Sequence, residues 1–468
     1  MSARSLTTRL RDHVSTIVVT TVSALFGVVL VEATGVLATA IGSDAALEQS
    51  NTVRIVLGAV TSVFILIAVY VGAIVTANTF STIIAGRVRQ IALLRLLGAQ
   101  SRRLRRSIAA EGLIVGLLGS LLGLVLGVAV TAGTVAIGVA GRWLPEAPYS
   151  FLDPATLLPV LIVALTTWAA AWVGSRRVTV VTPLAATGAA VEQAHERAPR
   201  RPVRTAFALV LGVLGVGLMA LGVVVGLLSP LGLVIAFFGG VFSFTGLIVG
   251  AHAVMPPVLR LAGRALGQRP PARLAAENAV RFPERSARAT IGLVIGVTLV
   301  TMFAVAMESY RSTILANFDG SPAARAAVDQ SLTATTAIFG ALVGVSAIIA
   351  AIGMVNNLSL SVLQRTRELG LLRALGFTGG QVRRMIVAES AQMSLASVVF
   401  GIVLGVLYGW VAAQSLLGSI THGIGAPTLP WLFLAVLVAC GAVLAIAASV
   451  APARRATTIS PVLALAIE

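Results

Sequence analysis

Two arginine-rich segments contain the side chains best suited to form charged contacts with another protein. Residues 365–389 have the sequence RTRELGLLRALGFTGGQVRRMIVAE, and residues 87–111 have RVRQIALLRLLGAQSRRLRRSIAAE. The carboxylate of Glu368 can pair with a guanidinium group, and the planar fork of Arg373 can bind a carboxylate or backbone carbonyl oxygens. These residue types predict charge-assisted docking rather than bond-making chemistry.

The segment at 365–389, the second along the chain, also has an apolar face. Its leucines recur at helical spacing at Leu369, Leu371, Leu372 and Leu375. This spacing predicts a short amphipathic helix, which we expect the glycine pair at Gly379 and Gly380 to end. We expect the apolar face to bind a partner protein. The alternative is a helix at the lipid headgroups whose charges are solvated.

The two segments are copies of one another. At a displacement of 278 positions they align without a gap and agree at 12 of 25 residues. The same displacement also pairs polar residues and helix breakers outside the segments: Asn78 with Asn356, Gly123 with Gly401, and Pro183 with Pro461. A register that holds over about a hundred residues predicts an internal duplication.

The elements that position these segments follow from the composition. Of 468 residues, 57% are hydrophobic and 11% are charged, which predicts an all-α polytopic membrane protein. Ten spans fit the thickness of a bilayer, at 14–40, 53–84, 108–141, 155–175, 205–228, 231–256, 288–309, 332–363, 386–415 and 428–451. We expect two parallel four-helix repeats joined by a two-helix hairpin that closes at Ser229 and Pro230. The corresponding domains are 1–190, 191–285 and 286–468.

The charge distribution sets the expected orientation. All 34 basic residues are arginines, and the net charge is +17. With an inside N-terminus and alternating spans, 30 of the 34 fall on the cytoplasmic side, a positive-inside bias that accounts for the charge without nucleic acid. We therefore expect a bacterial inner-membrane protein with both termini in the cytoplasm. The cytoplasmic linkers 178–204 and 257–284 are predicted to be solvated. A cleaved signal peptide is the alternative for the first span.

No catalytic or metal-binding arrangement is evident in the sequence. The chain has no lysine, so it lacks the residue that an ordinary P-loop places on the phosphates of ATP. We therefore expect no cofactor on this chain, and ATP with magnesium on a separate ATPase. The four histidines and the single Cys440 are scattered: His13, His195, His252 and His422.

Residues 367–376, RELGLLRALG, resemble the signature of the FtsX-like, MacB-like family of ABC-transporter permeases, where it follows the second helix of a four-helix unit. The first copy keeps Arg95 and Gly98 but has three replacements in the signature: Gln90, Ala92 and Leu96. The resemblance implies that each segment is a coupling helix docked on an ATPase, with two ATPase copies per chain. The implied coupling residues are Arg89, Arg95, Gly98, Arg367, Glu368, Gly370, Arg373 and Gly376.

Two acidic residues and a set of glycines complete the candidate sites. Glu32 and Glu308 lie near the outer ends of the first helix of each repeat, where an acid is costly unless it faces water, a partner or a substrate. They are candidates for an outer vestibule that binds a cationic amphiphile; snorkelling or capping at the interface is the alternative. Glycines at four-residue spacing predict helix-packing faces: Gly119, Gly123, Gly127, Gly401, Gly405 and Gly409.

Together these features predict a permease that couples ATP hydrolysis on another subunit to export or extraction of a lipophilic or amphipathic molecule. An antimicrobial peptide, a drug or a lipid would fit, and membrane lipids are expected partners. Movement would pass along the long spans by mechanotransmission. One alternative is a non-transporting signalling component that works with an ATPase and a sensor or envelope partner. Another is an ion-coupled secondary carrier, which would bind no ATPase.

Overall fold

The computed structural model describes somewhat more than half of the chain. The described residues are 100–175 apart from 142, 143, 145 and 152, then 202–265, 283–317 and 373–443 apart from 422. Residues 70, 277 and 371 and scattered positions between 17 and 39 and between 321 and 336 are also described. All regular structure in these residues is helical. The chain divides into two compact units, Met1–Ala198 and Pro199–Glu468.

Six described helices are long and apolar enough to cross a membrane. They are Arg102–Ala140, Pro154–Val173, Pro202–Gly226, Gly232–Val249, Thr290–Ala316 and Gly379–Thr421. Two shorter apolar helices, Thr20–Ala33 and Trp431–Val443, coincide with the first and last predicted spans. The predicted spans 53–84 and 332–363 lie outside the described residues except for isolated positions. The all-helical membrane class is thus confirmed, and the ten-span arrangement stays a prediction.

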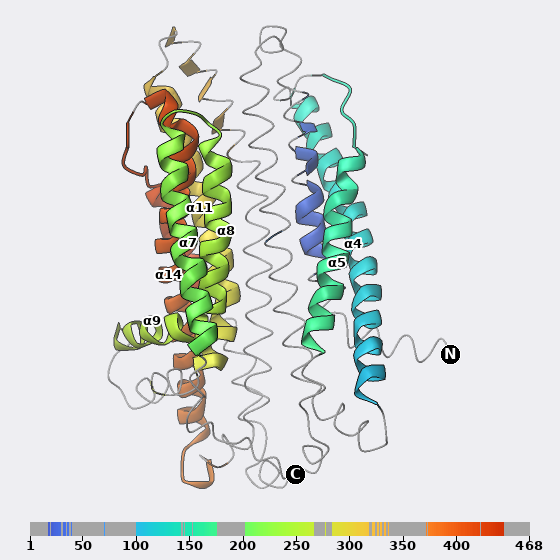
Figure 1. Cartoon of the computed structure of the whole chain (residues 1–468), viewed down its shortest axis with the longest axis vertical. Coiled ribbons are helices and arrows are strands. Elements are labelled where there is room, and N and C mark those ends of the chain that lie inside the picture. Colours follow the sequence, from blue (N-terminus) through green and yellow to red (C-terminus); the bar gives the residue numbers. More distant parts are fainter. Residues whose placement is uncertain are drawn as a thin grey trace. The chain divides into compact units, whose positions relative to one another are not determined.

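The first unit contains a long helix and a shorter neighbour. Helix α4 covers Ser101–Ala140, and α5, which covers Leu157–Gly174, packs beside it (Figure 1). A short 3-10 helix, Pro154–Thr156, leads into α5. Asp153 begins that helix because its carboxylate accepts a hydrogen bond from the backbone N–H of Ala155 at 3.0 Å. The 40 residues of α4 extend over about 60 Å, twice the hydrocarbon thickness of a bilayer.

The second unit is built around α11, Pro283–Ala316, and α14, Gly379–Thr421, which pack along one another. A hairpin of α7, Pro202–Gly226, and α8, Gly232–Val249, packs beside them (Figure 1). The turn between α7 and α8 contains Ser229 and Pro230, the predicted closing pair. Tyr408 of α14 joins the hairpin, since its hydroxyl lies 2.9 Å from the Ser243 hydroxyl.

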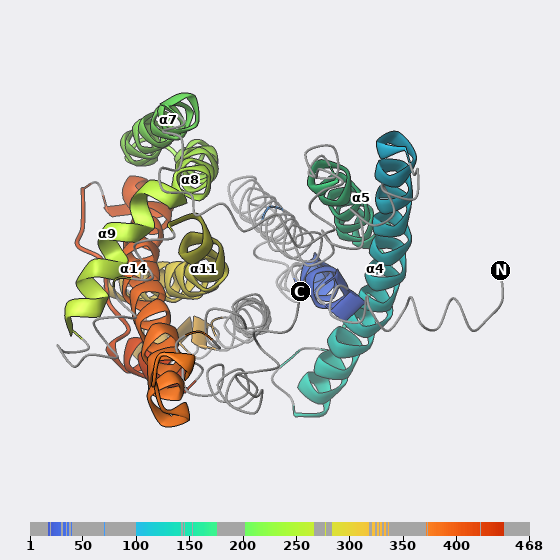
Figure 2. The same ribbon diagram turned by 90° about the horizontal axis from the view of Figure 1, so that it is seen from below.

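The sixth predicted span is wrong at its end. Helix α8 stops at Val249, and the next helix, α9, covers Ala251–Ala265 and lies across α11 and α14 (Figures 1 and 2). One stripe of α9 is buried, at Ala251, Met255, Leu259 and Ala262. The side-chain amide of Gln392 donates to the carbonyl oxygen of Leu259 at 2.8 Å and holds α9 on α14. The prediction of a solvated linker is therefore also wrong for Leu259 and Ala262, which are buried, whereas Arg260 and Arg264 of the same helix are exposed as predicted.

The two units repeat one pattern of helix contacts. A side chain added at the α4 glycines would meet residues 99 positions earlier: Thr20 for Gly119, Ala24 for Gly123 and Val28 for Gly127. At the α14 glycines it would meet residues 104 positions earlier: Val297 for Gly401, Thr301 for Gly405 and Val305 for Gly409. The third helices of the two copies, α4 and α14, therefore correspond at 278 positions along the sequence, and the first helices, Thr20–Ala33 and α11, correspond at 273. The second copy therefore has five more residues between its first and third helices.

Candidate functional site

The chain makes a defined turn between the second arginine-rich segment and α14. The backbone N–H of Leu375 donates to the carbonyl oxygen of Leu371 at 2.9 Å, and that of Gly376 donates to Arg373 at 3.1 Å. Gly376 then adopts a φ of 99°. A Cβ there would meet no atom within 4 Å, so the backbone conformation, rather than limited space, favours glycine at this position.

The prediction that Gly379 and Gly380 end the amphipathic helix is wrong. They are the first two residues of α14. Thr378 and Gln381 form a capping box around them. The Gln381 side-chain oxygen accepts from the Thr378 backbone N–H at 2.8 Å, and the Thr378 hydroxyl accepts from the Gln381 backbone N–H at 3.3 Å. The helix therefore ends at Gly376, and a new helix starts immediately after Thr378.

The first copy has the same backbone turn without the side-chain cap. The backbone N–H groups of Arg103 and Leu104 donate to the carbonyl oxygen of Gln100 at 3.0 and 3.1 Å, and those of Gln381 and Val382 donate to Thr378 at the same two distances. Gln100 makes no side-chain cap hydrogen bond. The first turns of α4 and α14 thus have the same backbone hydrogen bonds, and only that of α14 is also capped by side chains.

Two apolar side chains project from the turn. Leu371 is 52% exposed and Leu375 is 71% exposed, so a partner could cover both without unfolding the chain. Arg373 belongs to the same helical turn and is partly buried. The other predicted coupling residues lie outside the described residues: Arg89, Arg95, Gly98, Arg367, Glu368 and Gly370.

A contact that the sequence analysis did not identify lies close to the start of α4. The guanidinium carbon of Arg105 sits 4.9 Å from the ring centre of Trp172. The Arg105 Nε–H also donates to the Ser175 hydroxyl at 3.4 Å. These contacts tie the start of α4 to the end of α5. The only sequence signal is that Trp172 and Ser175 are three residues apart on one helix face.

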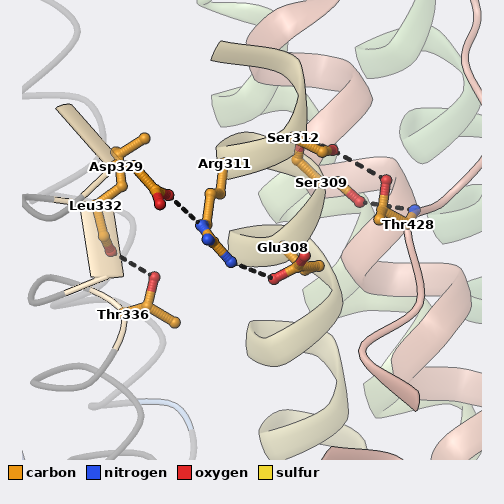
Figure 3. A network of polar contacts seen from close by, with 8 residues as sticks. All are labelled: Glu308, Ser309, Arg311, Ser312, Asp329, Leu332, Thr336 and Thr428. Carbon is orange, nitrogen blue, oxygen red and sulfur yellow. Dashed lines mark hydrogen bonds and ion pairs between the residues drawn. The ribbon is translucent and has the colours of Figure 1, made fainter. Parts of the chain in front are cut away.

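The candidate acid Glu308 belongs to a polar network at the end of α11 (Figure 3). Its carboxylate lies 3.9 Å from the guanidinium of Arg311, one turn later in the helix. Arg311 also binds Asp329, with 2.7 Å between Nε and the carboxylate oxygen. On the other side of α11, the Ser309 hydroxyl accepts from the Thr428 backbone N–H at 3.1 Å. The network links α11 to the segments on both sides of it.

The Arg311–Asp329 pair predicts a pH-dependent contact. The hydrogen bond from Arg311, assisted by its charge, holds the pKa of Asp329 below its ordinary value. The stabilisation is therefore complete above the ordinary pKa and is lost as the pH falls through the lowered one. The protection of amides at the described positions between 321 and 336, measured relative to the intrinsic exchange rate at each pH, should therefore fall by a few-fold in acid. In Asp329→Asn the protection of these amides should not fall with pH in this way. The prediction is contradicted if the variant and the original chain lose protection equally in acid.

The other candidate acid, Glu32, has different surroundings. It is 4% exposed, lies next to Thr131 of α4, and is separated from it by the 99 positions that relate the other contacts of this helix pair. In the second unit, where contacting residues are 104 positions apart, the equivalent contact is that of Val305 with Gly409. The contact register thus does not make Glu32 and Glu308 equivalent. Within the described residues, no group of three or more histidine, cysteine, aspartate or glutamate residues could hold a metal ion.

Comparison with known families gives two matches within the chain. The model of the FtsX-like permease C-terminal region matches residues 62–182 and again residues 340–461. The two matches cover just over half of the chain, and their starts are 278 positions apart. This is the displacement at which the two arginine-rich segments align, so the family matches support the duplication.

Individual relatives match a smaller part. An uncharacterized ABC transporter permease, YknZ of Bacillus subtilis (strain 168), is 33% identical over 139 residues, 28% of this chain and 32% of the relative. The pyoverdine export ATP-binding/permease protein PvdT of Pseudomonas entomophila (strain L48) is 30% identical over 131 residues, 28% of this chain and 19% of the relative. The macrolide export ATP-binding/permease protein MacB of Marinobacter nauticus is 28% identical over 141 residues, 30% and 21% respectively. The chain thus matches about a third or less of the length of each relative.

Proposed function

We propose, on the premise that this chain belongs to the FtsX-like permease family, that it is the permease subunit of an ABC transporter driven by an ATPase on another chain. The family and the apolar helices make it a multi-pass membrane protein with a permease role. The separate ATPase, the cargo, the inner-membrane location and the cytoplasmic termini are parts of the proposal.

The observation that carries the proposal is the turn that ends at Gly376. It presents Leu371 and Leu375 to the surroundings, and the capping box at Thr378 joins it directly to α14. An amphipathic helix with exposed leucines suits a hydrophobic groove on a partner. A displacement of the turn would be passed to α14 and, through close helix packing, to α11. This is the physical basis for mechanotransmission.

The ATPase would bind at two places. The absence of lysine supports the assignment of ATP and magnesium to the partner, and the duplicated segment supports one ATPase copy per repeat. The two sites would be unequal, because Gln90 stands where the second copy has Glu368, and only the second turn has a side-chain cap.

The proposed cargo is a lipophilic or amphipathic molecule. Two relatives bear the names of export proteins, one for pyoverdine and one for macrolides, which supports outward transport as the direction. Membrane lipids would surround the exposed apolar faces, such as the side of α7 that contains Leu209, Val213 and Val216.

The proposal is tested by purifying the chain with the ATPase encoded beside its gene and reconstituting both in proteoliposomes. We expect a stable complex with two ATPase copies and ATP-dependent movement of a fluorescent phospholipid or an amphipathic dye. If no complex forms, the chain is not an ABC permease in the proposed sense. If a complex hydrolyses ATP but moves neither probe, the transport assignment fails and the signalling alternative is favoured.

A further inference from the structure

One acidic side chain of the first unit is buried without a hydrogen-bond partner among the described residues. Glu32 is 4% exposed, and in that part of the chain neither of its buried carboxyl oxygens makes a hydrogen bond. The Thr131 hydroxyl lies beside the carboxyl group but donates to the carbonyl oxygen of Gly127 at 3.1 Å. Among the described residues, the buried side chains within one turn of this pair on the two helices are all valines: Val28, Val29, Val31 and Val135.

The second unit shows that packing does not require an acid here. Val305 and Gly409 occupy the equivalent positions, and Val305 is fully buried. A Cβ on Gly409 would lie 3.0 Å from the Val305 Cβ and 2.5 Å from the Met302 carbonyl oxygen, so the helices approach closely. The first unit instead places a carboxyl group and a hydroxyl group in this contact. Because burying an unpaired carboxyl group is costly, the presence of Glu32 in one copy alone indicates a functional role.

The Glu32 carboxyl group can be accommodated in this apolar contact in two protonation states. Its neutral, protonated form needs no counter-charge among the valines. Its ionised form needs a cation that enters with the ligand or water that enters when the helices part. Thr131 is 30 residues beyond Ser101, which corresponds to about 45 Å along α4. The acid therefore lies far along the helix from the start of α4, which lies within the first arginine-rich segment of the chain.

We propose that Glu32 is a protonatable binding site for the cationic head group of an amphipathic ligand, reached when the helix Thr20–Ala33 separates from α4. As the ligand binds, the carboxyl O–H bond breaks and its proton goes to water. The resulting carboxylate pairs with the ammonium group, and the apolar part of the ligand contacts the valines. One proton leaves for each cation bound. Only the transport of this ligand rests on the proposed function; the binding site does not.

The site is tested with two probes on the full chain in nanodiscs, without ATP or ATPase. Dicyclohexylcarbodiimide enters membranes and reacts with protonated carboxyl groups, so mass spectrometry should find it on Glu32, with less labelling as the pH rises. Dodecylamine at about nine times its dissociation constant should slow this labelling about tenfold, which corresponds to roughly 1.4 kcal/mol of stabilisation of the unreacted site. Dodecanol has the same chain length without the charge and should leave the rate unchanged.

Glu308 provides the internal control in the same sample. Its side chain is 32% exposed and lies near Arg311, so it should react with a water-soluble carbodiimide and should not be protected by dodecylamine. Glu32→Gln should abolish the proton release that accompanies dodecylamine binding, and Glu308→Gln should not. No label on Glu32, or equal protection by amine and alcohol, overturns the proposal even if Glu32→Gln fails to fold. Because neither probe requires ATP, failure here leaves the ABC permease assignment standing.

Discussion

Replacing Gly405 with isoleucine is expected to destroy the packing of α11 against α14. A side chain at this position would collide with the Thr301 Cβ and lie 2.8 Å from the Thr298 carbonyl oxygen. A β-branched residue and a backbone atom both bound the space, so neither can move aside as the end of a flexible side chain would. Overpacking usually costs about 1–3 kcal/mol and occasionally more, and we expect at least the upper value here.

The measurement is the free energy of unfolding in mixed detergent micelles, together with the yield of monodisperse protein. Gly217→Ile is the matched control, because Gly217 is an exposed position of α7 where an added Cβ would meet nothing within 4 Å. The control should retain the stability of the original chain or gain slightly, because isoleucine has the higher helix propensity. Equal stability of the two variants would show that Gly405 does not limit the approach of the two helices.

The same glycine contacts show which part of the fold can be predicted from sequence. Small residues at four-residue spacing indicate a packing face whatever the partner, and length with apolar composition indicates a span. Both signals are local, so α4, α5, α7, α11 and α14 were predictable as helices. The helices they pack against were not predictable. The alignment at 278 positions fits the third helices, whereas the first helices correspond at 273 positions, because the second copy has five more residues between them.

The errors have a common physical origin. The apolar character of the chain continues across Gly250, so composition gives no sign that α8 ends there. Helix α9 lies across the bundle because its stripe at Met255 and Leu259 is buried there and Gln392, 133 residues away from Leu259, holds it. At the turn before α14, called the coupling turn here for its proposed role, three glycines compete for the role of helix stop: Gly376, Gly379 and Gly380. Only the pattern Thr378 to Gln381, a capping box, could have indicated that α14 begins before the last two.

The candidate sites were predictable in residue type but not in environment. Glu32 and Glu308 appeared similar because both are acids near the end of a first helix. Burial separates them: the Glu308 side chain is 32% exposed and lies near Arg311, and Glu32 is 4% exposed where its own helix packs against α4. This difference in burial depends on which residues of α4 and α14 face each first helix. Such pairing joins residues about a hundred positions apart, so no local sequence pattern reveals it.

Changing Leu375 to aspartate is expected to remove the ATPase from the complex while the permease stays folded. Leu375 is 71% exposed, so the chain itself loses little packing. In a hydrophobic groove the new carboxylate would be buried without a partner, and the loss of a central anchor costs about 2 kcal/mol or more, a factor of roughly 30 in affinity. The measurement is the dissociation constant of the purified ATPase for the permease in nanodiscs.

Leu228→Asp is the control for this change. Leu228 is 84% exposed and lies in the turn between α7 and α8, so the same charge is introduced at a similarly exposed leucine away from the coupling turn. We expect the control to bind ATPase with unaltered affinity. If both variants bind equally well, the leucines of the coupling turn do not contact the ATPase. If only Leu375→Asp fails to bind, the ATPase contacts Leu375, and α14 is the helix that follows this contact in the chain.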